Sequence, residues 1–101
     1  MKTVMDWKRN VGKGWHSIIE EAIEKIESHS GFVLQVKEKF AGLRIYTHGG
    51  DMEAIDDVVR AAESRAALSC EYCGELGSIR TIGFVIKTLC PKCYTDHVAK
   101  R

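Results

Sequence analysis

The sequence predicts an α+β protein in which a small antiparallel sheet packs against two helices. Two segments carry apolar residues at helical spacing, and two segments between them alternate apolar and polar residues as strands do. All four cysteines follow the second helical segment, in two Cys-x-x-Cys pairs that flank a short apolar stretch. We therefore expect a helix–hairpin–helix core over residues 1–69 and a zinc-ribbon-like hairpin over residues 70–101, joined in one compact unit.

The first helix is predicted to begin near Trp15, after a segment in which Gly12 and Gly14 indicate a mobile connection. Its apolar residues recur at intervals of three and four, with acidic residues on the opposite face. These apolar residues are Trp15, Ile18, Ile19, Ala22, Ile23 and Ile26. Residues 28–31 end the helix, and Gly31 suits the position just past its C-terminus, where the chain often turns left-handed.

Residues 32–40 and 43–47 are predicted to pair as an antiparallel hairpin, because residues 40–42 can turn the chain between them. The alternation places one set of side chains toward the core: Phe32, Leu34 and Val36 in the first strand, and Leu43, Ile45 and Thr47 in the second. A Gly-Gly pair then ends the second strand, and Asp51 is a suitable N-cap for the next helix.

The second helix is predicted over residues 52–69 and leads directly into the first cysteine pair. Its apolar stripe consists of Met52, Ile55, Val58, Val59, Ala62 and Ala66. Between the cysteine pairs, residues 78–82 and 84–89 are predicted as two short strands around Gly83. The residues after the second pair are expected to add one or two helical turns.

The cysteine spacing predicts a metal site. Cys70 and Cys73 form one pair, Cys90 and Cys93 form the other, and the sixteen residues between the pairs are typical of a four-thiolate zinc site. We expect these side chains to bind one structural Zn²⁺ per chain, in a site whose four sulfurs leave no coordination position for a substrate. The alternatives are two disulfides, as in a secreted protein, or four free thiols.

Composition and charge are those of an ordinary globular protein. The chain is 45% hydrophobic and 29% charged, and its formal net charge of +1 argues against general attraction to nucleic acid. Residues 1–10 lack the apolar segment of a signal peptide, and no apolar run approaches the roughly 18 residues of a membrane span. We therefore expect a cytoplasmic protein without membrane contact, where thiolates bind metal rather than form disulfides.

An enzyme is not expected, because the motifs of common catalytic sites are missing. The zinc deaminase signature needs His-x-Glu and then Pro-Cys-x-x-Cys, whereas Leu89 precedes Cys90 and Pro91 lies inside the pair. The nucleophile elbow, the phosphate-binding loop and the His-Glu-x-x-His motif are also missing. We therefore assign no catalytic residue and expect no small-molecule substrate.

Several motifs together resemble a family of small, largely uncharacterised bacterial and phage proteins. They are Gly14-Trp15 near the start of the first helix, the segment QVKEKFAGLRIY at 35–46, Cys-x-x-Cys-Gly at 70–74 and Leu-Cys at 89–90. Ala41 stands where that family has glycine, and Cys93 stands where it often has histidine, which also binds zinc. The resemblance covers roughly residues 14–97 and implies a small zinc-binding protein, without an activity.

Four side chains of the predicted hairpin form a candidate contact surface, which we call the outer face. They are Lys37, Lys39, Arg44 and Tyr46, and the alternation places them opposite the core. Long basic side chains and tyrosine are common in protein interfaces, although the same pattern also describes a solvated strand face. The acidic residues of the second helix (Glu53, Asp56, Asp57 and Glu63) are expected to be solvated or to meet a basic partner.

These features predict a non-enzymatic zinc-binding interaction module with a protein partner. A phage origin, which the resemblance suggests, implies an accessory protein that binds and modulates a host complex, such as a defence system. The alternative is a nucleic-acid-binding zinc ribbon with a regulatory role. That alternative would use the basic and aromatic residues around the cysteines, namely Tyr72, Arg80, Phe84, Lys87, Lys92 and Tyr94.

Overall fold

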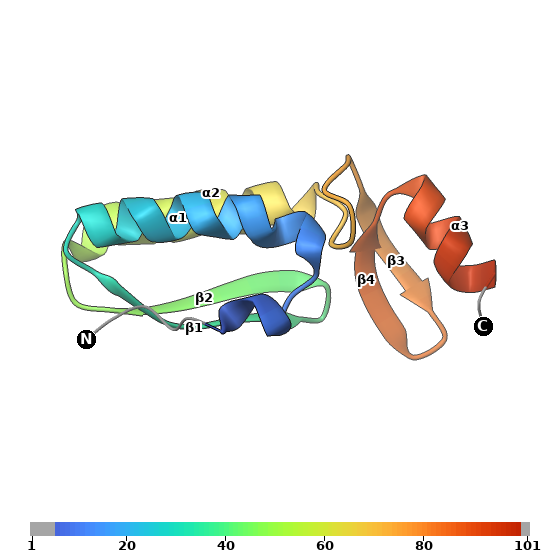
Figure 1. Cartoon of the computed structure of the whole chain (residues 1–101), viewed down its shortest axis with the longest axis horizontal. Coiled ribbons are helices and arrows are strands. Elements are labelled where there is room, and N and C mark those ends of the chain that lie inside the picture. Colours follow the sequence, from blue (N-terminus) through green and yellow to red (C-terminus); the bar gives the residue numbers. More distant parts are fainter. Residues whose placement is uncertain (1–5, 100–101) are drawn as a thin grey trace.

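The structure is a computed structural model that describes residues 6–99. Its elements are η1 (Trp7–Arg9), η2 (Lys13–Trp15), α1 (His16–Ser28), β1 (Phe32–Lys39), β2 (Gly42–His48), α2 (Met52–Ala67), β3 (Ser78–Ile82), β4 (Val85–Leu89) and α3 (Pro91–Ala99). Strands β1 and β2 form one antiparallel sheet, and β3 and β4 form a second. The helices α1 and α2 lie over one face of β1–β2, and the β3–β4 hairpin lies with α3 at one end of the molecule (Figure 1). The predicted α+β class is confirmed.

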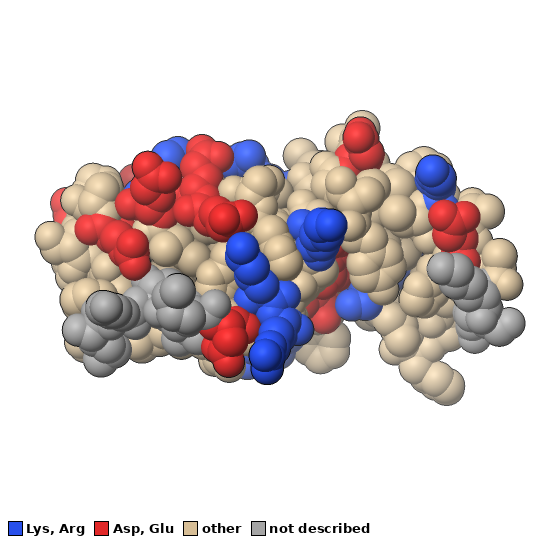
Figure 2. All heavy atoms as spheres, viewed as in Figure 1, with Lys and Arg blue, Asp and Glu red and all other residues tan. Residues whose placement is uncertain are grey.

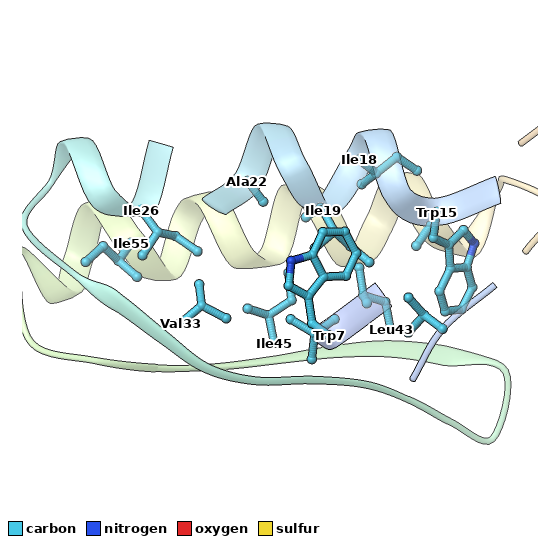
Figure 3. Close-up of a cluster of buried hydrophobic side chains, with 14 residues drawn as sticks. Trp7, Trp15, Ile18, Ile19, Ala22, Ile26, Val33, Leu43, Ile45 and Ile55 are labelled. Atoms are coloured by element: carbon cyan, nitrogen blue, oxygen red, sulfur yellow. The ribbon is translucent and has the colours of Figure 1, made fainter. Parts of the chain in front are cut away.

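The main core lies between the two long helices and the β1–β2 sheet (Figure 3). The long helices contribute Ile18, Ile19, Ala22, Ile26, Ile55, Ala62 and Ala66, Trp15 comes from η2, and the strands contribute Val33, Val36, Leu43 and Ile45. The segment before α1 adds Trp7 and Val11. Most of the predicted apolar stripes are therefore buried, because both helices place one face against the sheet.

The predicted alternation of β1 is wrong at its start. Val33 is fully buried, whereas Leu34 is 41% exposed. Val33 lies opposite Thr47 and Gln35 lies opposite Tyr46, so Leu34 is an extra residue between them. Such a bulge interrupts the two-residue period of a strand. It allows both Val33 and Val36 to face the core.

The end of α1 differs in detail from the prediction. Ser30, rather than Gly31, takes the left-handed conformation, with a φ of 66°. The N–H of Ser30 donates to the carbonyl of Glu27, and the N–H of Gly31 donates to that of Ile26, both at 3.0 Å. These bonds satisfy carbonyls at the helix end. Gly31 is needed for another reason, since a Cβ there would collide with Cδ1 of Ile55.

The start of α2 is capped as predicted, but its first residue does not reach the core. The Asp51 side chain accepts a hydrogen bond from the N–H of Ala54 at 3.3 Å. Met52 is 79% exposed and lines a groove between α2 and β2 instead of the interior.

No helix in the described part of the chain is long and apolar enough to cross a membrane.

Candidate metal centre

The four cysteines come together at one point. Their sulfur atoms all lie within 4.8 Å of one another, and the Sγ atoms of Cys73 and Cys90 are 3.6 Å apart. Four sulfurs bound tetrahedrally at 2.3 Å from zinc would be about 3.8 Å apart, so the cluster has the size of a four-thiolate site. All four are free cysteines, which contradicts the disulfide alternative. The cluster is able to hold a metal ion.

Each cysteine pair is shaped by local backbone hydrogen bonds. In the first turn, the N–H of Gly74 donates to the carbonyl of Cys70 at 2.9 Å, and Gly74 has a φ of 84°, which favours glycine. The second turn joins β4 to α3. There the N–H of Cys93 donates to the sulfur of Cys90 at 3.3 Å. Because α3 begins inside the second pair, the C-terminal helix starts earlier than predicted and Cys93 lies in its first turn.

The surroundings of the sulfurs affect their ionisation unequally. Burial opposes ionisation of Cys70, but hydrogen bonds from the backbone of Cys90 and Cys73 outweigh it and lower the pKa of Cys70 to about 7. Burial raises the pKa of Cys93 well above its usual range, and the neighbouring thiols add to this effect. One thiolate therefore forms readily, whereas a further one is opposed. A divalent cation removes that opposition, because it stabilises each thiolate that binds it.

The first cysteine turn is hydrogen-bonded to the segment that precedes α1. The N–H of Gly12 donates to Oε2 of Glu71 at 3.0 Å, and the N–H of Gly14 donates to the Glu71 carbonyl at 2.7 Å. The indole N–H of Trp15 donates to the carbonyl of Ser69 at 2.9 Å. A Cβ on either glycine would collide with the backbone of the first cysteine turn. The expectation of a mobile connection at these glycines is therefore wrong, because they allow close packing.

The β3–β4 hairpin also contacts the β1–β2 turn. The buried hydroxyl of Thr88 donates to the carbonyl of Ala41 at 3.0 Å. The ammonium of Lys87 lies 3.5 Å from a carboxylate oxygen of Glu71 and 3.8 Å from one of Glu38. Glu71 is only 2% exposed, so these partners compensate for burial of its charge. Sequence reasoning missed this contact between the two hairpins, because the residues that form it do not recur at any regular interval along the chain.

The predicted outer-face residues do share one side of the sheet. Lys37 lies opposite Arg44 and Gln35 lies opposite Tyr46, and directly opposed residues point to the same face. The ammonium of Lys37 lies 5.4 Å from the centre of the Tyr46 ring. Arg44, Tyr46 and Lys39 are exposed and Lys37 is half-buried. The helices cover the opposite face of the sheet (Figure 1).

Arg80 and Lys87 of the β3–β4 hairpin both contact groups within the protein, and Nε of Arg80 is buried without a hydrogen-bond partner. The guanidinium of Arg80 lies 4.8 Å from the centre of the Tyr94 ring, and Lys87 lies between two carboxylates. The rings of Tyr72 and His97 are stacked, with centres 6.2 Å apart. On the face seen in Figure 2, acidic side chains gather over the helices and few charged side chains lie over the β3–β4 hairpin.

Comparison of the chain with protein-family models, curated proteins and solved structures found no match. Fold and site therefore define the class of protein. It is a small α+β protein whose C-terminal hairpin carries a four-cysteine cluster able to hold a metal ion.

Proposed function

We propose that the protein is a non-enzymatic interaction module, stabilised by one Zn²⁺ bound to Cys70, Cys73, Cys90 and Cys93. Zinc is the metal that most commonly occupies four-cysteine structural sites, and four protein ligands leave it without an open position for a substrate. The role of the ion is then to hold the C-terminal hairpin against the core. A contact surface elsewhere on the molecule carries the function.

The observation that supports this proposal is the outer face of β1–β2, which lies opposite the face that α1 and α2 cover. Its three basic side chains, Lys37, Lys39 and Arg44, give it a charge of +3, and Tyr46 adds an aromatic ring. The nearby acidic residue Glu38 is turned away, because its carboxylate accepts a hydrogen bond from the N–H of Ala41 at 2.7 Å. The face therefore suits an acidic protein surface. The resemblance to bacterial and phage proteins favours a host complex as the source of that partner.

Alanine variants of Arg44 and Tyr46 test this surface. A partner captured from the native host would be purified, and its affinity would be measured for the zinc-loaded protein and for each variant. We expect Arg44→Ala and Tyr46→Ala each to weaken binding by more than about 1 kcal/mol. Thermal melting should hardly change, because neither side chain is buried.

Lys92→Ala provides a matched control, because Lys92 is exposed on α3, away from the outer face. It should leave the affinity unchanged. Normal binding by both outer-face variants would exclude this face as the contact surface. Salt-dependent retention of the protein on nucleic acid, lost in Lys92→Ala, would instead support the nucleic-acid alternative. The two ion pairs of Lys87 disfavour that alternative, because they neutralise one of the basic groups that it would use.

A further inference from the structure

Strand β2 has a free edge. Among the described residues its only strand partner is β1. The side chain of Asn10 donates to the carbonyl of Val36 at 3.0 Å, so this carbonyl points away from β2. Val36 lies directly opposite Ile45, so the two form a non-hydrogen-bonded pair. In a pair of this kind, both residues direct their backbone N–H and C=O groups away from each other. Ile45 and, two residues later, Thr47 therefore present N–H and C=O groups at the free edge.

A groove of about 700 Å³ runs beside this edge, between β2 and the first turns of α2. Its apolar lining includes Ile45, Ile55 and Val59. Met52 also lines it and is 79% exposed, and the flexible thioether of methionine adapts well to bound side chains. An unpaired strand edge next to an apolar groove is the arrangement that binds an extended peptide by strand addition.

Charge determines which occupant the groove suits. Glu53 and Asp56 line it on the α2 side, where the carboxylate of Asp56 already pairs with the guanidinium of Arg60 at 2.7 Å. If a second copy of the chain paired β2 with β2, the two α2 helices, which pack on β2, would approach each other across the symmetry axis. The acidic residues of both copies would then lie close together, which is unfavourable. An extended segment with a basic side chain would instead neutralise Glu53.

We propose that the groove between β2 and α2 binds an extended segment of a partner protein as a third strand of the β1–β2 sheet. The segment's backbone bonds to Ile45 and Thr47, one of its apolar side chains enters the groove, and a Lys or Arg lies beside Glu53. This surface is separate from the outer face of the hairpin. The proposal is therefore independent of the function proposed above.

A displayed library of random linear peptides, selected against the full zinc-loaded chain, tests this inference. We expect enrichment of peptides that combine β-branched or aromatic residues with Lys or Arg. Binding of a synthesised peptide should shift the amide resonances of Ile45 and Thr47 more than those of Arg44 and Tyr46, whose amides face β1. Thr47→Pro removes one edge N–H and should weaken binding by about tenfold.

A pair of charge reversals on α2 provides a test that leaves the sheet intact. Glu53→Lys reverses a charge in the groove between β2 and α2. Asp57→Lys reverses a charge at a different site, the pocket between α1 and α2. The first should weaken the basic peptide about fivefold or more, and the second should leave its affinity unchanged. Failure to enrich any peptide, or shifts confined to another surface, would overturn the proposal. A dimer in sedimentation with protected Ile45 and Thr47 amides would overturn it in favour of a second copy.

Discussion

At the scale of single residues, close approach of backbones determines how the metal centre is attached. Gly12 and Gly14 have no unusual conformation, yet neither position has space for a Cβ. Their N–H groups both bond to Glu71, which follows Cys70, the first cysteine of the cluster. Glycine is therefore required here by contact with a distant segment rather than by backbone conformation.

Gly14→Ala should destabilise the protein by about 1–3 kcal/mol, the usual cost of forcing extra volume into a packed site. The added methyl group would collide with the carbonyl of Cys70 and the N–H of Gly74. Chemical denaturation of the zinc-loaded protein measures the change. Lys13→Ala is the control, because Lys13 is exposed in the same turn. Equal stability of the two variants would contradict the close packing.

Thr88→Val should cost about 1–3 kcal/mol, because it leaves the buried carbonyl of Ala41 without its hydrogen-bond donor. Thr81→Val makes the same change at an exposed position of β3 and should alter stability by less than about 0.5 kcal/mol. Denaturant midpoints of both variants measure the difference. If Thr88→Val were as stable as Thr81→Val, the contact between the two hairpins would contribute little.

At the scale of elements, the two sheets differ in what supports them. The β1–β2 hairpin packs on two long helices, whereas the second buried cluster contains only Cys70, Ile82, Leu89 and Cys90. Two of those four residues are cysteines of the metal centre. Such a small cluster supplies little apolar burial, so we expect the structure of β3, β4 and α3 to depend on a bound metal ion.

We expect elemental analysis to find one zinc per chain, and removal of that zinc by a chelator to disorder residues 74–89. Metal binding at such sites is worth on the order of 10–16 kcal/mol in peptides. Zinc should also be lost as the pH falls, because protons compete for the thiolates. Amide resonances report the disorder, and Cys73→Ser should reproduce it. Unchanged dispersion of residues 74–89 after metal removal, or zinc content near zero, would exclude a structural ion.

At the scale of the whole molecule, the metal centre and the core are connected at two places. One is the contact of Gly12 and Gly14 with Glu71, and the other is the contact of Thr88 with Ala41. The molecule measures 44 × 21 × 20 Å, and these contacts join its two parts along the long axis. Both contacts are formed between segments far apart in sequence, so they couple the two parts during unfolding.

The zinc-loaded protein should therefore unfold in one cooperative transition. Helix loss, followed by far-ultraviolet circular dichroism, should coincide with zinc release, followed by a colorimetric metal indicator. In Gly14→Ala the two curves should separate, with zinc released first. Release of zinc well before the helices melt in the unmodified protein would show that the two parts unfold independently.

The sequence by itself determined the features that have a local signature. Apolar spacing predicted α1 and α2, alternation predicted the β1–β2 hairpin, and cysteine spacing predicted the cluster. Each of these patterns is a fixed spacing along the chain, so it can be recognised without knowledge of the fold. The outer face followed from the same alternation, because the bulge in β1 lies before Gln35 and the pairing beyond it is regular.

Only the tertiary structure decided the bulge at Leu34, the close packing of Gly12 and Gly14, and the burial of Glu71. The bulge brings a second valine of β1 to the core, which is favourable only once the helices are in place. The bond from Gly12 to Glu71 joins positions 59 residues apart. Such contacts leave no periodic signal in the sequence, because they depend on which backbones approach each other when the two hairpins pack end to end.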